Sequence, residues 1–216
     1  MKLSTSLVKS FICAAVVGLS FGCGEDDDKK STEDAASFGG FEYTVKSGEL
    51  DTSADGQISG TGQMLMSTPI ASEAGGEVNV GLQFTLEDGG NLRLYAFAGA
   101  NLEGGLNFQF TRSGTDLTLA MSQGGQDTSF AFTGIDASET INFRIDIHNG
   151  EGEDGHILMW NVAPDAGLEG VETVVDTEET DKGVSPGKGQ GTGWGIELTN
   201  ATLTGLTLGD AENEEE

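Results

Sequence analysis

The polar residues best suited to bind a ligand lie in one stretch, Ile141 to Asn161, where they alternate with apolar residues. A strand with this period of two turns its apolar side chains to one face and its polar side chains to the other. If Ile157 and Met159 point inward, one face carries Asn142, Arg144, Asp146, His148, His156 and Trp160. An aromatic ring beside charged and amide groups suits a polar ligand such as a sugar. We therefore predict a ligand-binding face made of these six residues.

A second interpretation of the same residues remains open. Trp160 would then belong to the core, and the charged side chains would form a solvated sheet face. The register decides between the two, because a slip of one residue moves every side chain to the opposite face. Asn149-Gly150 opens a turn, which predicts a hairpin near the middle of an antiparallel sandwich. We expect Trp194 to lie in the core.

A short acidic loop is the first candidate for a metal. Side chains with oxygen atoms stand at loop positions one, three and five, on Asp51, Ser53 and Asp55. A calcium loop has this spacing, but its twelfth position carries a glutamate, and Gly62 stands there in this chain. A calcium site and an ordinary Asp/Gly turn are both compatible with the pattern. Residues 151–154 contain a second acidic cluster with the same two interpretations.

The overall charge excludes one class of partner. The chain of 216 residues has 36 acidic and 10 basic residues, which gives a formal net charge of −26. Such a chain repels a phosphate backbone, so we expect no nucleic-acid binding. The two cysteines, Cys13 and Cys23, both lie near the N-terminus. The remainder of the chain therefore has neither a disulfide framework nor a cysteine zinc site.

The first 22 residues have the features of a secretory signal peptide. A basic start precedes an apolar run, 11–21, that is too short to span a bilayer comfortably. The run ends at Leu19-Ser20-Phe21-Gly22-Cys23, which resembles the bacterial lipoprotein signal. That resemblance implies that Cys23 becomes the lipid-bearing mature N-terminus. Ser20 departs from the family, which has an aliphatic residue there, so an ordinary signal peptide remains the alternative.

The segment after Cys23 predicts a tether. Residues 23–37 are rich in acids and have almost nothing apolar to bury, which indicates a solvated spacer. The acidic run also resembles the surface-export signals of some Gram-negative lipoproteins. We expect an exported protein that is anchored in the bilayer of the bacterial outer membrane and faces the periplasm or the cell surface. Residues 209–216 predict an acidic disordered tail.

The body of the chain, residues 38–208, predicts one all-β domain. Alternating strands recur every ten to fifteen residues or so and are separated by Gly- and Asp-rich turns, which is typical of a sandwich or barrel. Glu87-Asp88-Gly89-Gly90-Asn91 predicts a turn between two such strands. Residues 162–193 lack strong alternation, although one short strand could form near Val171, Val174 and Val175.

The strand series resembles a known family. GGNLRLYAF, GGLNFQFTRSGTDLTLAM, INFRIDIHN, HILMWN and GTGWGIELTNATLTGLTL together look like the concanavalin A-like jelly roll, which includes lectins, laminin-G-type modules and some glucanases. The resemblance lies in strand rhythm rather than in a diagnostic motif. It implies a two-sheet antiparallel jelly-roll sandwich that binds its ligands on the concave face and the rim loops.

The sequence gives no support to catalysis. The glucanases of this superfamily carry Glu-x-Asp-x-x-Glu on one strand. Glu49 and Asp51 match its first half, but Ala54 stands at the last position. No phosphate-binding loop occurs in the sequence. We therefore expect no enzymatic activity.

Together these features predict a lipid-anchored envelope protein with a lectin-like module for binding or adhesion. Its expected ligand is a glycan or another component of the cell envelope, and calcium is the one candidate cofactor. The alternative is a structural envelope lipoprotein that binds only protein partners.

Overall fold

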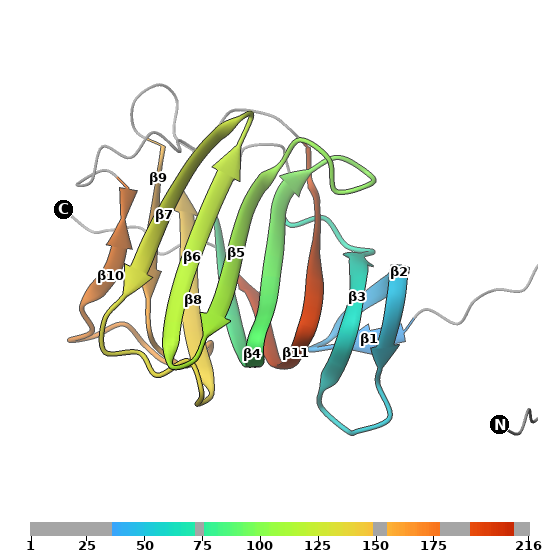
Figure 1. The fold of residues 1–216 in the computed structure, drawn as a ribbon. Helices are drawn as coiled ribbons and strands as arrows, with labels where there is room; N and C mark the ends of the chain where they lie inside the picture. The colour runs from blue at the N-terminus through green and yellow to red at the C-terminus, as the bar shows by residue number, and fades with distance from the viewer. Residues whose placement is uncertain (1–35, 72–75, 149–154, 178–190, 210–216) are drawn as a thin grey trace, which may run out of the picture. The chain divides into compact units, whose positions relative to one another are not determined.

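The computed structural model describes residues 36–71, 76–148, 155–177 and 191–209, and these form eleven β-strands (Figure 1). The strands are β1 (Ala36–Phe38), β2 (Phe41–Asp51), β3 (Ile58–Met66), β4 (Val78–Ala98), β5 (Leu106–Ser113), β6 (Asp116–Gln123), β7 (Gln126–Phe132), β8 (Ile141–His148), β9 (His156–Trp160), β10 (Thr173–Asp176) and β11 (Gly193–Gly209). Every paired strand is antiparallel to its neighbour. The all-β prediction is confirmed.

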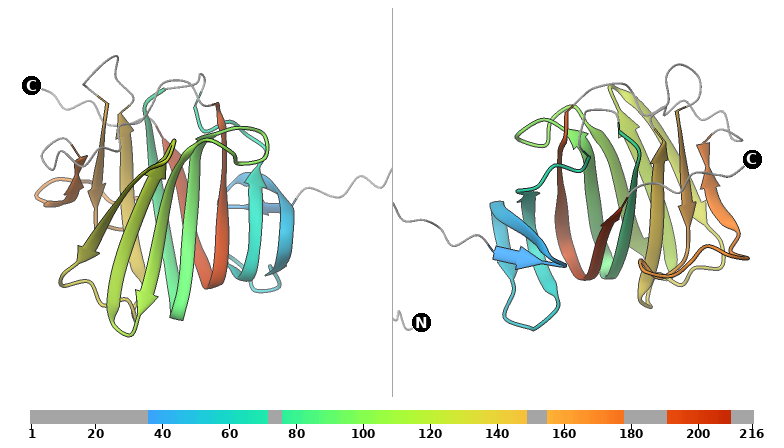
Figure 2. Two further views of the ribbon diagram at one scale, coloured as in Figure 1. Left: turned by 45° about the horizontal axis from the view of Figure 1, so that its top comes forward. Right: turned by 180° about the vertical axis from the view of Figure 1, so that it is seen from behind.

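Two long strands, β4 and β11, connect the two layers of the sandwich. Residues 91–96 of β4 pair with β5, whereas residues 78–84 of the same strand pair with β8. β11 runs beside both halves of β4. The first layer therefore has the order β7-β6-β5-β4-β11-β3-β2-β1, and the second has the order β10-β9-β8-β4-β11. Figure 1 shows β5–β7 in front of β8–β10, and the view from behind in Figure 2 shows β8–β10 in front. In these views β4 and β11 turn from one layer into the other.

The turn that we predicted at residues 87–91 is wrong. β4 continues through this segment and bends there, and the register between β4 and β11 shifts at the same level, between Thr199 and Ala201. The bend requires a close approach of two backbones, since a Cβ on Gly90 would lie 2.4 Å from the carbonyl oxygen of Asn200. Asn200 itself has a φ of 48°, a left-handed conformation that asparagine tolerates. A Gly-rich acidic stretch can thus bend one strand as readily as it can join two.

The core fills the space between the layers with the apolar side chains of alternating positions. Ile141, Phe143, Ile145 and Ile147 of β8 are all fully buried or nearly so, as predicted. Trp194 is also buried, as predicted. Its indole Nε1 donates a hydrogen bond of 2.9 Å to the carbonyl oxygen of Thr68. In β8 the alternation in the sequence therefore separates core positions from outward ones correctly.

The hairpin of β8 and β9 lies inside the second layer, between β10 and β4. This position agrees with the prediction of a hairpin near the middle of the sandwich, and the four-residue β10 lies beyond it. β10 lies in the segment that lacked alternation, close to the valines that suggested a short strand. Its pairing with β9 shifts register between Thr173 and Val175, which explains why no clear period of two is visible there.

Candidate functional site

The six residues of the predicted ligand-binding face do share one face of the second layer. In the register of β8 and β9, Arg144 lies opposite Trp160, and His148 lies opposite His156. Asn142 and Asp146 lie on the same side of β8, because Ile141, Phe143, Ile145 and Ile147 point into the core. The condition that we set for a shared face, with Ile157 and Met159 pointing inward, is therefore met.

This shared face is largely covered. Asp146 is 1% exposed, Trp160 is 7% exposed and His148 is 8% exposed. The segment 163–166 crosses the sheet here, and we call it the strap. Arg144 Nη1 donates a 3.2 Å hydrogen bond to the carbonyl oxygen of Ala166 in the strap. The face is thus neither an open binding surface nor part of the core between the layers.

The polar side chains under the strap contact one another. Asn79 donates a hydrogen bond to the carboxylate of Asp146, and Arg144 Nε lies 4.0 Å from the same carboxylate. The rings of His148 and His156 stack with centroids 4.5 Å apart. A hollow of 220 Å³ remains beside Asn79 and Arg144. These contacts give the polar face a structural role, and its ligand-binding role stays a prediction.

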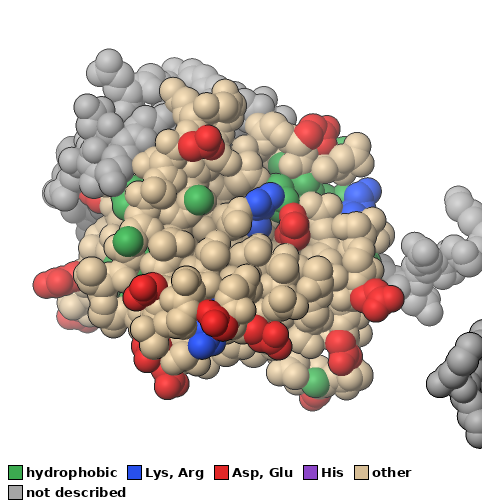
Figure 3. Space-filling model, in the orientation of Figure 1, with side chains coloured by type: hydrophobic (Ala, Val, Ile, Leu, Met, Phe, Trp, Pro, Cys, Tyr) green, Lys and Arg blue, Asp and Glu red, His purple; other side chains and the backbone are tan. Residues whose placement is uncertain are grey.

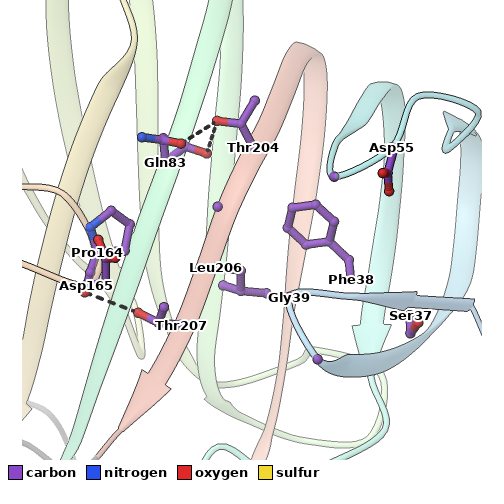
Figure 4. Close-up of a pocket in the computed structure, with 13 residues that line it drawn as sticks. Ser37, Phe38, Gly39, Asp55, Gln83, Pro164, Asp165, Thr204, Leu206 and Thr207 are labelled. Carbon is purple, nitrogen blue, oxygen red and sulfur yellow. Dashed lines mark hydrogen bonds between the residues drawn. The ribbon is translucent and has the colours of Figure 1, made fainter.

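The residues of the predicted calcium loop lie at the turn between β2 and β3. Asp51 Oδ1 accepts a 2.8 Å hydrogen bond from the backbone N–H of Ser53. Hydrogen bonds from Ser53 lower the pKa of Asp51. Asp55 lines a pocket on the second layer (Figure 4). In the described parts of the chain no group of three or more His, Cys, Asp or Glu residues could hold a metal ion. Calcium binding stays a prediction, and residues 151–154 lie outside the described residues.

A different polar surface lies on the outward face of the first layer. The register places Glu197, Arg93 and Gln109 side by side on β11, β4 and β5. The next row, two residues along each strand, contains Gly195, Tyr95, Asn107, Ser122 and Asp127. Outward side chains in neighbouring rows lie within reach of one another. We call these two rows the polar ladder.

The polar ladder is held by its own hydrogen bonds. Arg93 Nε donates to Gln109 Oε1 at 3.2 Å, and Arg93 Nη1 donates to the Tyr95 hydroxyl oxygen at 3.2 Å. The Tyr95 hydroxyl donates to Glu197 Oε2, and Arg93 Nη1 lies 3.9 Å from that oxygen. Burial and the hydrogen bond to Glu197 raise the pKa of Tyr95. The network fixes the directions of the side chains before any ligand arrives.

The polar ladder lines a hollow of 310 Å³, and Leu102 forms part of its wall. Arg93 and Glu197 remain about one third exposed. Asn107 Oδ1 is buried at the hollow and accepts no hydrogen bond within the part of the chain that the structure describes. The face seen in Figure 3 has scattered Asp and Glu side chains and few Lys or Arg side chains. The hollow thus combines fixed donors, an unused acceptor and an apolar wall.

Sequence reasoning missed the polar ladder. The alternation placed Arg93 and Tyr95 on the face away from the core, but no motif joined them to Gln109 or Glu197. Glu197 is distant in sequence, and only the pairing of β11 with β4 brings it next to Arg93. One signal was available, because the outward positions 93, 95, 107 and 109 of two successive strands carry Arg, Tyr, Asn and Gln.

Several solved structures are similar to this chain. A legume lectin-like domain from Entamoeba histolytica superposes with a TM-score of 0.51 and 8% identity, over 79% of this chain and 90% of that domain. The carbohydrate-binding module CBM66 from Bacillus subtilis gives a TM-score of 0.49 and 14% identity, over 79% of this chain and 95% of the module. Sheep galectin-11 gives 0.41 and 8%, over 69% and 97%. At 8% identity, the similarity to the legume lectin-like domain is evidence for the fold alone. It confirms the two-sheet antiparallel jelly-roll sandwich.

Two comparisons of the sequence with known proteins find no match. No protein-family model matches the sequence, and no curated protein matches it as a relative. Within the described ranges, no helix has the length and apolar character needed to cross a membrane. Cys23 and most of the predicted tether lie outside those ranges.

Proposed function

We propose that this protein is a non-catalytic glycan-binding module and that it binds sugar at the polar ladder. The observation that carries the proposal is the hollow of 310 Å³ on the outward face of the first layer. It is lined by planar polar side chains whose directions are fixed by hydrogen bonds, among them Arg93, Asn107 and Gln109. A binding site of this kind needs few changes in side-chain conformation when a ligand arrives.

The chemistry of the polar ladder suits a neutral sugar. Each hydroxyl of a sugar is both a donor and an acceptor, and the hollow has partners of both kinds on Arg93, Asn107 and Asp127. The C–H faces of a sugar ring can pack against Leu102 and the ring of Tyr95. Glu197 lies next to Arg93 and offsets its positive charge. The site therefore favours an uncharged glycan over an anionic one.

The glycan proposal predicts a large effect of Arg93→Ala. The full-length protein is first screened on an array of cell-envelope and plant glycans, and the best ligand is titrated by calorimetry. Loss of a charged hydrogen-bond donor is expected to weaken binding about tenfold or more. Lys46→Ala removes the same charge from an exposed position on β2 and is expected to leave the affinity unchanged.

Two outcomes would contradict the proposal. One is an equal loss of affinity in the Arg93→Ala and Lys46→Ala variants. The other is an array without any bound glycan, together with a protein partner recovered by cross-linking, which would favour the structural envelope lipoprotein. Arg93→Ala is expected to melt near the temperature of the parent chain, because Arg93 is partly exposed. Such a melting temperature shows that the variant is folded.

We further propose that the module is exported and held at the bacterial outer membrane by lipid on Cys23. The resemblance of residues 19–23 to the lipoprotein signal and the acidic run that follows support this proposal. A clickable fatty-acid analogue should label the wild-type chain and should not label Cys23→Ser, which should also leave the membrane fraction. Labelling of the Cys23→Ser variant, or no labelling of the wild type, would contradict lipidation.

A further inference from the structure

A larger cavity opens on the outward face of the second layer, on the opposite side of the sandwich from the polar ladder. It measures 530 Å³ and lies between the β1–β2 turn, the β2–β3 turn, the strap and β11 (Figure 4). Phe38 and Leu206 contribute apolar surface, and Figure 4 shows both near its centre, between Asp55 on one side and Asp165 on the other. A volume of this size is in the range of small-molecule sites.

The strap forms one wall of this cavity, and its position depends on Gly81. A Cβ on Gly81 would lie 2.2 Å from Thr207 Oγ1 and 2.5 Å from Cβ of Pro164. Thr207 and Arg144 hold the strap through the carbonyl oxygens of Pro164 and Ala166. The wall that presents Asp165 is therefore a built part of the second layer.

Most hydrogen-bond donors that line the cavity are already used within the protein. The Thr204 hydroxyl donates to Gln83, the Thr207 hydroxyl donates to the carbonyl oxygen of Pro164, and the Gln83 amide donates to Asn142. The side-chain donors left for a ligand among the described lining residues are the Ser37 hydroxyl and the second amide hydrogen of Gln83. Acceptors remain available on the threonine oxygens and on the two carboxylates. The cavity therefore selects a ligand that donates several hydrogen bonds.

The charge of the lining points the same way. Asp55 and Asp165 are exposed, and neither has an ion pair or hydrogen bond in the described structure. Among the residues that the structure describes, no lysine, arginine or histidine lines the cavity. An anion is disfavoured there, while a cation gains from both carboxylates and from contact with the ring of Phe38. An alkylammonium group meets both requirements, because it is positively charged and carries three donors.

We propose that this cavity binds a primary ammonium group attached to a compact body, such as a lysine side chain or an amino sugar. The site lies on the opposite layer from the polar ladder and does not depend on glycan binding there. One module can then hold two ligands at once, a neutral glycan on one face and an amine on the other.

The test uses two amine probes with the full-length protein, Nα-acetyl-lysine methylamide and glucosamine, titrated by calorimetry. Their N-acetylated counterparts keep the body of each probe, lack the charge and are larger by one acetyl group. Each acetylated probe is expected to bind about tenfold more weakly or worse, and binding of the amines should weaken as salt is added. Comparison of the two amines distinguishes a peptide source from a sugar source.

The variants locate the site. The double substitution Asp55→Asn and Asp165→Asn keeps the side-chain shapes and is expected to lower amine affinity about tenfold. Asp116→Asn removes an exposed carboxylate at the start of β6 and is expected to leave the amine affinity unchanged. Arg93→Ala is also expected to leave the amine affinity unchanged. Gly81→Ala, which displaces the strap, should weaken amine binding and leave glycan binding intact.

The proposal is overturned by any of three results. The first is that the acetylated probes bind as well as the amines. The second is that the double variant keeps the amine affinity of the parent chain, which would indicate diffuse attraction to an acidic surface. The third is the absence of saturable binding up to about 20 mM amine, a concentration well above a dissociation constant of about 1 mM. None of these results depends on the outcome for the polar ladder.

Discussion

The Phe143→Ala substitution is expected to lower the free energy of unfolding by about 3–5 kcal/mol relative to the parent chain. Phe143 is fully buried and projects from β8 in the second layer. Its ring stacks on Phe110 of β5, with centroids 5.1 Å apart, and lies 5.1 Å from the ring of Phe132 of β7. One side chain thus contacts two strands of the opposite layer, so its removal leaves a cavity that the two layers cannot readily close.

Chemical denaturation followed by Trp fluorescence measures this loss for Phe143. Phe143→Leu is the matched control, and it is expected to cost much less because it keeps most of the buried volume. In a thermal scan, each kcal/mol corresponds to about 2–4 °C for a domain of this size. A loss below about 1 kcal/mol for Phe143→Ala would show that the packing between the layers does not depend on this ring.

Asp146→Ala is expected to destabilise the protein by about 3 kcal/mol, although it removes a polar side chain from an outward face. Asp146 is 1% exposed and lies between Asn79 and Arg144 under the strap. Removal of its carboxylate takes one negatively charged partner from a nearly buried guanidinium, and the desolvation penalty of that charge is then less well compensated.

The control for Asp146 is Asp116→Ala, which removes an exposed carboxylate and is expected to change stability by less than about 0.5 kcal/mol. Both variants are measured by urea denaturation at neutral pH. Equal stabilities of the two variants would mean that the carboxylate under the strap has no structural role. Because Asp146 lies on the second layer, the folded variant should keep its affinity for glycan at the polar ladder.

The alternation of residues was sufficient to predict much of the fold. The isoleucines of β8 and the buried Trp194 follow from a period of two, since each apolar side chain had one face to occupy. The shared face of Arg144 and Trp160 also followed from that period. The bend in β4 did not, because Gly89-Gly90 has the same local chemistry in a bent strand as in a hairpin turn.

The location of candidate sites depended on contacts between distant parts of the chain. Residues 163–166 contact the outward face of the second layer at Arg144 of β8, and nothing in the spacing of β8 and β9 indicates that a later segment returns to it. In the same way, Glu197 meets Arg93 only because β11 pairs with β4. A period of two predicts which side of a strand a residue faces, but it does not predict what lies beside that residue or above it.

The most direct test of the proposed function is to map the bound glycan on the protein by NMR. The best ligand from the array is added to the isotope-labelled full-length chain, and the backbone amide shifts are compared. The account predicts the largest changes at residues 93–95, 107–109 and 195–197, around the polar ladder. Changes confined to residues 81–83, 164–166 and 204–207 on the other layer, with none at the polar ladder, would contradict it.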